Sequence, residues 1–190
     1  MTGASHRWAR PKGAADLSTR AATALSGTTA LLAGARLAFG RLVGRPLVLV
    51  SLLALAIAAM VALVERGYEP VGAATRVLTV VFGLVVPLAS FAVLSIATGR
   101  ARIGETVWPL ARHGLRSSHL ALGLLLGVMV VAAGLAVVTV ELSLVLSRGA
   151  DGYGAGAAGL GRDALTSGWI AALGAAAYVA WFGLGAAFFR

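Results

Sequence analysis

Residues 46–64 read PLVLVSLLALAIAAMVALV, a run that contains no charged side chain and a single hydroxyl group. At about 1.5 Å of rise per residue, a helix of this length crosses the roughly 30 Å hydrocarbon core of a bilayer. Pro46 suits the first helical turn, where the N–H that proline lacks has no intrahelical partner in any case. The run therefore predicts a membrane-spanning helix.

Three further apolar runs have the length of a span: residues 77–99, 120–140 and 164–189. The first carries Gly83 and Pro87 in its interior, which predicts a kink that neighbouring helices must accommodate. With 59% hydrophobic residues, 12% charged residues and a mean hydropathy of +0.90, the 190-residue chain lies outside the range of soluble domains. We predict an all-α, polytopic integral membrane protein with about four transmembrane helices.

The sequence excludes several function classes. A net charge of +9 would suit a nucleic acid, but the arginines fall in short separate segments rather than on one solvated face. The chain contains no cysteine, hence no disulfide or thiolate nucleophile, and its three histidines are poorly placed for a haem. Paired intramembrane carboxylates, aspartate clusters and helical His-Glu spacing are also missing from the sequence. We predict no catalytic residue, metal or cofactor, no nucleic-acid partner, and no enzyme.

Basic residues are concentrated in alternate connections, which predicts the orientation because cytoplasmic loops carry the excess of Lys and Arg. Residues 1–45 hold seven basic residues against Asp16 alone. In the loop at 99–117, Arg100, Arg102, Arg112 and Arg116 stand against Glu105. The other connections are balanced: Glu65, Glu69, Asp151 and Asp163 oppose Arg66, Arg76, Arg148 and Arg162. We expect both termini and the 99–117 loop to be cytoplasmic.

We predict a disordered basic cytoplasmic tail at 1–20 and an interfacial amphipathic helix at 21–45. A four-span transmembrane domain follows at 46–190. On a helical wheel one face gathers Leu25, Leu32, Phe39 and Leu42, although Arg36 falls on the same face. Arg20, Arg41 and Arg45 lie on the opposite face. The first long apolar run begins only near residue 46, so we interpret that run as an uncleaved anchor rather than a secretory signal.

Two glycine patterns stand out. Residues 154–159 spell G-x-G-x-x-G, but this dinucleotide motif functions only between a strand and a helix of a soluble βαβ unit, so we interpret it as a flexible outer loop. Gly123 and Gly127 form G-x-x-x-G in the third span. This spacing lets another helix approach closely, and we interpret the pair as helix-packing positions within the bundle.

Glu141 is the only acidic residue attached to a span. Counted at about 1.5 Å per residue from Leu120, it lies roughly 30 Å along the helix, at the outer boundary rather than the midplane. A solvated interfacial carboxylate is one interpretation. The other is a polar contact that lines an outward pathway or pairs across subunits.

The basic loop has room for a short helix at 103–113. The stretch IGETVWPLARHG at 103–114 places apolar side chains between Glu105 and Arg112, with Pro109 limiting the length of the helix. This pattern is typical of a docking element for a soluble partner. A loop that is basic only because it is cytoplasmic is the alternative.

The order of these features resembles the type-2 ATP-binding-cassette (ABC) exporter permeases. The matching features are an N-terminal interfacial helix, a proline in the second span, a short cytoplasmic helix with Thr and Leu, an Arg before the third span and a Gly soon after it starts. The residues that match are Pro87, Thr106, Leu110, Arg116 and Gly123. The fourth span, LGAAAYVAWFGLGAAFFR, is similar to the family's fourth span, which commonly ends in small residues and Phe-Arg.

The sequence departs from the family pattern in two places. Arg100-Ala101-Arg102 stands where the family often has an acidic residue, which bears on how an ATPase would dock. The family usually has six spans, and a fifth would follow Arg190. We therefore expect either an incomplete chain or a short subunit whose partner completes the pathway.

The resemblance implies a permease subunit of an ABC-type exporter in a bacterial cytoplasmic membrane. Its partners would be cytoplasmic ATPase subunits, a second permease subunit as homodimer or heterodimer, and membrane lipids. The ATPase-docking residues would be Glu105, Thr106, Val107, Trp108, Leu110 and Arg112, with Trp108 and Leu110 as anchors. A four-span scaffold subunit without a transport pathway is the alternative, and an ion-coupled carrier is disfavoured because convincing polar groups near the midplane are missing from the sequence.

Overall fold

The computed structural model describes residues 12–68, 72–99, 101–148 and 157–188, and all regular structure within these ranges is helical. The elements are α1 Lys12–Leu42, α2 Arg45–Tyr68, α3 Ala73–Val80, the π-helical turn η1 Val81–Val85, α4 Val86–Thr98, α5 Ile103–Ala111, α6 Ser117–Arg148 and α7 Ala157–Phe188. The segments long and apolar enough to cross a membrane are Arg45–Gly67, Ala73–Ala111, Ser117–Ser147 and Ala164–Ala187. The predicted all-α fold with four spans is confirmed, and the chain is an integral membrane protein.

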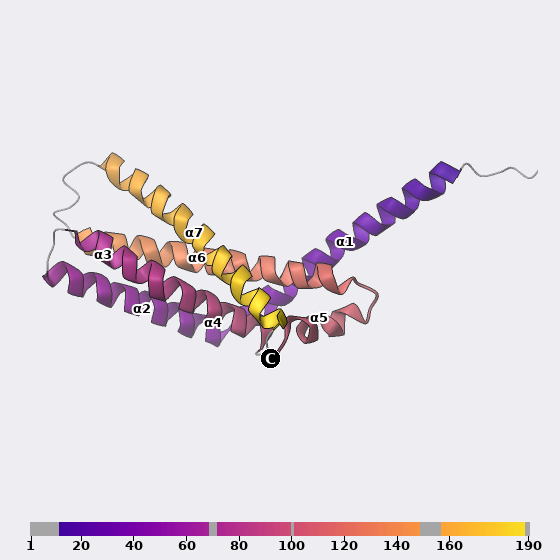
Figure 1. Ribbon diagram of the computed structural model, residues 1–190, viewed down its shortest axis with the longest axis horizontal. Helices are drawn as coiled ribbons and strands as arrows, with labels where there is room; N and C mark the ends of the chain where they lie inside the picture. The colour runs from indigo at the N-terminus through magenta and orange to yellow at the C-terminus, as the bar shows by residue number, and fades with distance from the viewer. Residues whose placement is uncertain (1–11, 69–71, 100, 149–156, 189–190) are drawn as a thin grey trace, which may run out of the picture.

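Helix α6 is the centre of the bundle. It contacts α1, α2, α3, α4, α5 and α7, whereas the other helices each have fewer neighbours. Figure 1 shows α6 running along the bundle, with α2 and the α3–α4 span beside it and α7 crossing it at a slant. Helices α1 and α5 lie at the end where α6 begins. We call this the basic end, because Arg41, Arg102, Arg112 and Arg116 lie there.

Helix α2 turns its small residues towards the bundle and its large apolar residues outwards. Helix α2 buries Ala54, Ala58 and Ala62, one every four residues, so they form a single stripe. Its Leu52 and Leu63 are more than half exposed. Apolar side chains gain nothing by leaving lipid for another helix, so close backbone packing over small residues holds such bundles together. The exposed leucines are the surface expected to face lipid.

The closest helix approach joins α1 to α6. A Cβ atom built on Gly34 of α1 would overlap the carbonyl oxygen of Leu120, and one built on Gly123 of α6 would overlap the carbonyl oxygen of Leu31. One turn further along, a Cβ on Gly127 would lie 2.9 Å from the Cβ of Ala38. Only glycine fits at these positions, and Gly123 and Gly127 both pack against α1.

Helix α1 packs through small residues and only one of the residues that the wheel groups. Ala30, Gly34, Ala38 and Leu42 are buried against the bundle, whereas Leu32 and Phe39 remain exposed. The helix begins at Lys12, inside the segment expected to be disordered, and residues 1–11 lie outside the described part of the chain. Exposed Leu32 and Phe39 leave an apolar surface for the membrane interface, and that location stays a prediction.

The second span is interrupted where the sequence predicts a kink. The N–H of Val86 donates to the carbonyl oxygen of Val81, five residues back, so the turn at Val81–Val85 is π-helical. Pro87 follows directly, near the start of α4. In a regular helix its ring would clash with the carbonyl group of Gly83, four residues earlier, and the wider turn relieves that clash.

We expect Gly123→Ala to lower the free energy of unfolding by about 1–3 kcal/mol, the usual cost of overpacking, because the new methyl group meets the α1 backbone. Gly134→Ala is the matched control on the same helix, since a Cβ there meets open space; it should be neutral or stabilising by up to about 1 kcal/mol. Equilibrium unfolding in mixed detergent and SDS micelles measures both. Equal midpoints for the two variants would contradict the described α1–α6 contact.

Candidate functional site

Short helix α5 follows directly from the turn that ends the second span. Gly99 caps α4 in the left-handed conformation at φ 62°, which suits glycine because it has no Cβ. The Glu105 carboxylate then accepts a hydrogen bond from the backbone N–H of Arg102 at 3.3 Å, which fixes the start of α5. Gly114, at φ 86°, turns the chain after the helix. The helix Ile103–Ala111 thus occupies most of the 103–113 segment.

One face of α5 is locked onto the bundle. The buried hydroxyl of Thr106 donates to the carbonyl oxygen of Thr98 at 3.1 Å. Ile103 and Val107 are buried beside it. The Arg41 guanidinium of α1 donates to the neighbouring carbonyl oxygen of Ala97 at 3.1 Å. These two side chains satisfy carbonyl groups at the end of α4 that have no helical partner, so α1, α4 and α5 are joined at one point.

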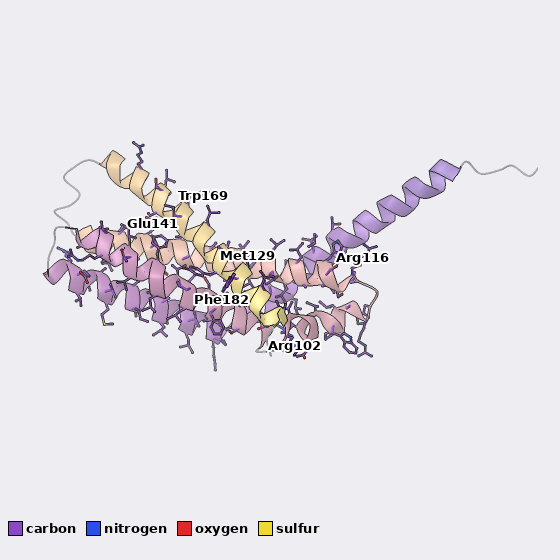
Figure 2. The ribbon with its side chains drawn as sticks, viewed as in Figure 1. Arg102, Arg116, Met129, Glu141, Trp169 and Phe182 are labelled. Atoms are coloured by element: carbon purple, nitrogen blue, oxygen red, sulfur yellow. The ribbon has the colours of Figure 1, made fainter. Side chains whose placement is uncertain are left out.

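The other face of α5 is open. Trp108 is 59% exposed, and the Arg112 guanidinium lies 4.8 Å from the centre of its ring in a cation–π contact. Glu105 is exposed on the same short helix. Arg102 and Arg116 are also exposed nearby, so the surface is basic, and Figure 2 labels both residues at this end of the bundle.

The six residues expected to dock an ATPase therefore divide between the two faces. Glu105, Trp108 and Arg112 are exposed, and Leu110 is half-buried against the core. Thr106 and Val107 are buried within the bundle. Only the first three have side chains fully available to a partner, and the other three hold α5 in place.

Glu141 lies towards the opposite end of the molecule from Arg116, as Figure 2 shows. It is half-buried on α6, and its carboxylate accepts a hydrogen bond from the Ser167 hydroxyl of α7 at 3.2 Å. A Cβ on Gly168 would stand 3.1 Å from the same oxygen, so glycine allows this close approach. Glu141 thus joins α6 to α7.

A small cavity of about 360 Å³ lies beside this contact, between α3, α6 and α7. Its polar lining comes from Thr75, Arg162, Thr166 and Ser167. An ion pair at this end, 2.7 Å between Arg76 Nε and Glu65 Oε2, ties α2 to α3. Within the described ranges no group of three or more His, Cys, Asp and Glu side chains is placed to hold a metal ion.

Residues 154–156 of the glycine motif lie outside the described residues, and so do Glu69, Arg100 and Asp151. Residues 157–159 of the motif form the start of α7 and not the loop that the sequence predicts. No protein-family model, curated protein or solved structure matches the chain.

We expect Thr106→Val to loosen α5. The substitution keeps the side-chain volume but removes one of two donors to the Thr98 carbonyl oxygen, which still accepts from the Ala101 N–H at 3.2 Å. The loss of the hydrogen bond between α5 and α4 should cost about 1 kcal/mol in the free energy of local opening. Hydrogen–deuterium exchange of peptides covering 101–112 measures it, and exchange should be faster. The control is Thr79→Val, because that exposed hydroxyl bonds only within its own helix, to Thr75. Unchanged exchange in Thr106→Val would show that the hydrogen bond does not hold the helix.

Proposed function

We propose that this protein is the membrane-spanning permease subunit of an ABC-type exporter, which couples ATP hydrolysis by separate nucleotide-binding subunits to movement of a substrate across the membrane. The observation that carries the proposal is the two-faced α5 helix. Its outer face offers Trp108 and Arg112 to a partner, and its inner face is fixed to two spans. Exposed tryptophan and arginine are the side chains that most often dominate protein contacts.

A movement of the bound ATPase would displace α5, and α5 would transmit that displacement to the bundle by direct contact. The Thr106–Thr98 hydrogen bond joins α5 to the end of the second span, and buried Val107 belongs to the core that α6 organises. Rigid helices linked in this way move as one body, which is how domain closure is transmitted in switching proteins. The ATPase would bind at Trp108 and Arg112, and a second permease subunit would complete the pathway.

The proposed orientation puts the basic end and both termini in the cytoplasm, in a bacterial cytoplasmic membrane. Arginine distribution supports it, because Arg36 and Arg41 precede the first span, Arg45 begins it, and three exposed arginines surround α5. At the opposite end the Arg76–Glu65 ion pair neutralises its own charges. The basic end thus carries an excess of positive charge and the opposite end is closer to neutral, as the positive-inside rule requires.

The orientation is testable by single-cysteine labelling. The chain has no native cysteine, so only the introduced residue reacts with the label. His113→Cys beside α5 and Gly161→Cys on α7 both replace exposed residues. A membrane-impermeant maleimide should label Gly161→Cys in intact cells and His113→Cys only after permeabilisation. The reverse pattern would refute the orientation and, with it, docking of a cytoplasmic ATPase.

A scaffold subunit of a larger membrane complex is the second candidate. The exposed leucine surface of α2, which includes Leu49, Leu52, Leu53 and Leu63, favours it, since such a surface suits other membrane helices as well as lipid. The two candidates differ in the partner that they require. The permease needs a soluble ATPase, whereas the scaffold needs only membrane subunits.

Purification of the full chain in mild detergent from its native membrane distinguishes them. We expect an ATPase to co-purify, and the double variant Trp108→Ala with Arg112→Gln to lower its recovery at least about tenfold, since a contact of this kind contributes on the order of 2 kcal/mol. Trp169→Ala is the matched control, because Trp169 is 67% exposed on α7, away from α5. Recovery of membrane subunits alone, or full ATPase recovery with the double variant, would contradict the permease proposal.

A further inference from the structure

A groove of about 1020 Å³ lies between α5, α6 and α7, at the upper end of the size range of ligand pockets. Its long walls are apolar: Leu122 and Leu126 come from α6, and Ala180 and Leu184 come from α7. The first two turns of α5 and the residue before them line the groove where α6 begins and α7 ends, with Arg102, Glu105 and Trp108. The groove is therefore apolar along its length and carries charged side chains at the basic end.

The apolar walls belong to membrane-spanning segments and are open to the side. Leu126 is 47% exposed and Leu184 is 57% exposed, so both are available to an acyl chain of the bilayer. The start of α5 lies where α6 begins and α7 ends. In a bilayer, this end of the two spans meets the lipid headgroups. Trp108 suits that depth, because tryptophan is enriched at membrane–water interfaces.

The charged end of the groove carries one group of each sign. Arg102 and Glu105 stand three residues apart at the start of α5, both exposed and both lining the groove. Glu105 accepts from the backbone N–H of Arg102 through one carboxylate oxygen, which leaves acceptor capacity on that group. Among the described residues, Arg102 forms no salt bridge. Its guanidinium therefore has donors available for a phosphate.

We propose that the groove binds one glycerophospholipid whose headgroup carries both a phosphate and a primary ammonium. Arg102 would hold the phosphate, Glu105 would accept hydrogen bonds from the ammonium, and an acyl chain would lie between Leu126 and Leu184. Such a lipid could bind whether or not the protein is a permease subunit.

Charge complementarity selects this occupant over others. A second copy of the chain or a partner helix would bring an apolar surface against Arg102 and Glu105 and leave two charges poorly solvated. A phospholipid with an anionic headgroup that lacks an amine would satisfy Arg102 but bring its phosphate near the Glu105 carboxylate. A quaternary ammonium has no N–H to donate to that carboxylate. A headgroup with both groups can pair its phosphate with Arg102 and its primary ammonium with Glu105.

The test is a lipid titration of the purified, delipidated full chain, followed by native mass spectrometry. The probes are phosphatidylethanolamine, phosphatidylglycerol and phosphatidylcholine with identical acyl chains. We expect phosphatidylethanolamine to bind about tenfold more tightly than the other two, the ratio that one charge-assisted hydrogen bond supplies.

Three variants separate the parts of the site. Arg102→Gln should weaken all three lipids about tenfold, because they share the phosphate. Glu105→Gln should remove only the preference for phosphatidylethanolamine, and glutamine still caps the helix. Ala180→Phe should fill the groove and weaken all three lipids.

The controls are Arg116→Gln, which removes an exposed charge outside the groove, and Ala177→Phe, which enlarges an exposed residue on α7 away from it. Both should bind lipid as the unaltered chain does. Equal affinity for the three lipids, tighter binding of phosphatidylglycerol, or identical losses in Arg116→Gln and Arg102→Gln would overturn the proposal. Unchanged binding in Ala180→Phe would show that the lipid sits elsewhere.

Discussion

The close approach of backbones to α6 is the constraint on which the rest of the structure depends. Gly34, Gly123 and Gly127 bring α1 within contact of the α6 backbone, and the alanine stripe of α2 does the same on another side. In lipid, such packing is a main source of helix association, because burying leucine gains little there. The position of α1 in turn places Arg41 on the end of α4. Hence the architecture of the basic end follows from three glycines.

The sequence predicts the spans well because apolar length is a property of single segments. It predicts contacts between segments less well. The apolar face on the wheel of α1 includes Leu32 and Phe39, which are exposed, and Leu42, which is buried. The rest of the packing face is made of small residues such as Gly34 and Ala38, which a hydrophobic pattern does not emphasise. The Glu141–Ser167 contact joins residues 26 positions apart, and periodicity within one helix carries no information about such a pair. The split of the docking segment into inner and outer faces likewise depends on how α5 rotates against α6.

Helix α5 connects two surfaces with different chemistry. Trp108 with Arg112 faces outwards, while Arg102 and Glu105 lie at the mouth of an apolar groove, and Trp108 borders both. A partner that covers Trp108 would therefore narrow the approach to the groove. Binding at one of these surfaces changes the solvent and steric environment of the other, so the two sites share a wall rather than acting at a distance.

The π-helical turn at Val81–Val85 has a mechanical consequence. It holds one residue more than an α-helical turn, so the side-chain faces of α3 and α4 are out of phase by about 100°. Pro87 removes one backbone hydrogen bond beside it, and Gly83 adds no side chain to stiffen it. The span therefore consists of two helical segments whose faces point in different directions. A force applied at α5 would reach the segment that carries Thr98 first, and the Arg76–Glu65 ion pair ties the other segment to α2.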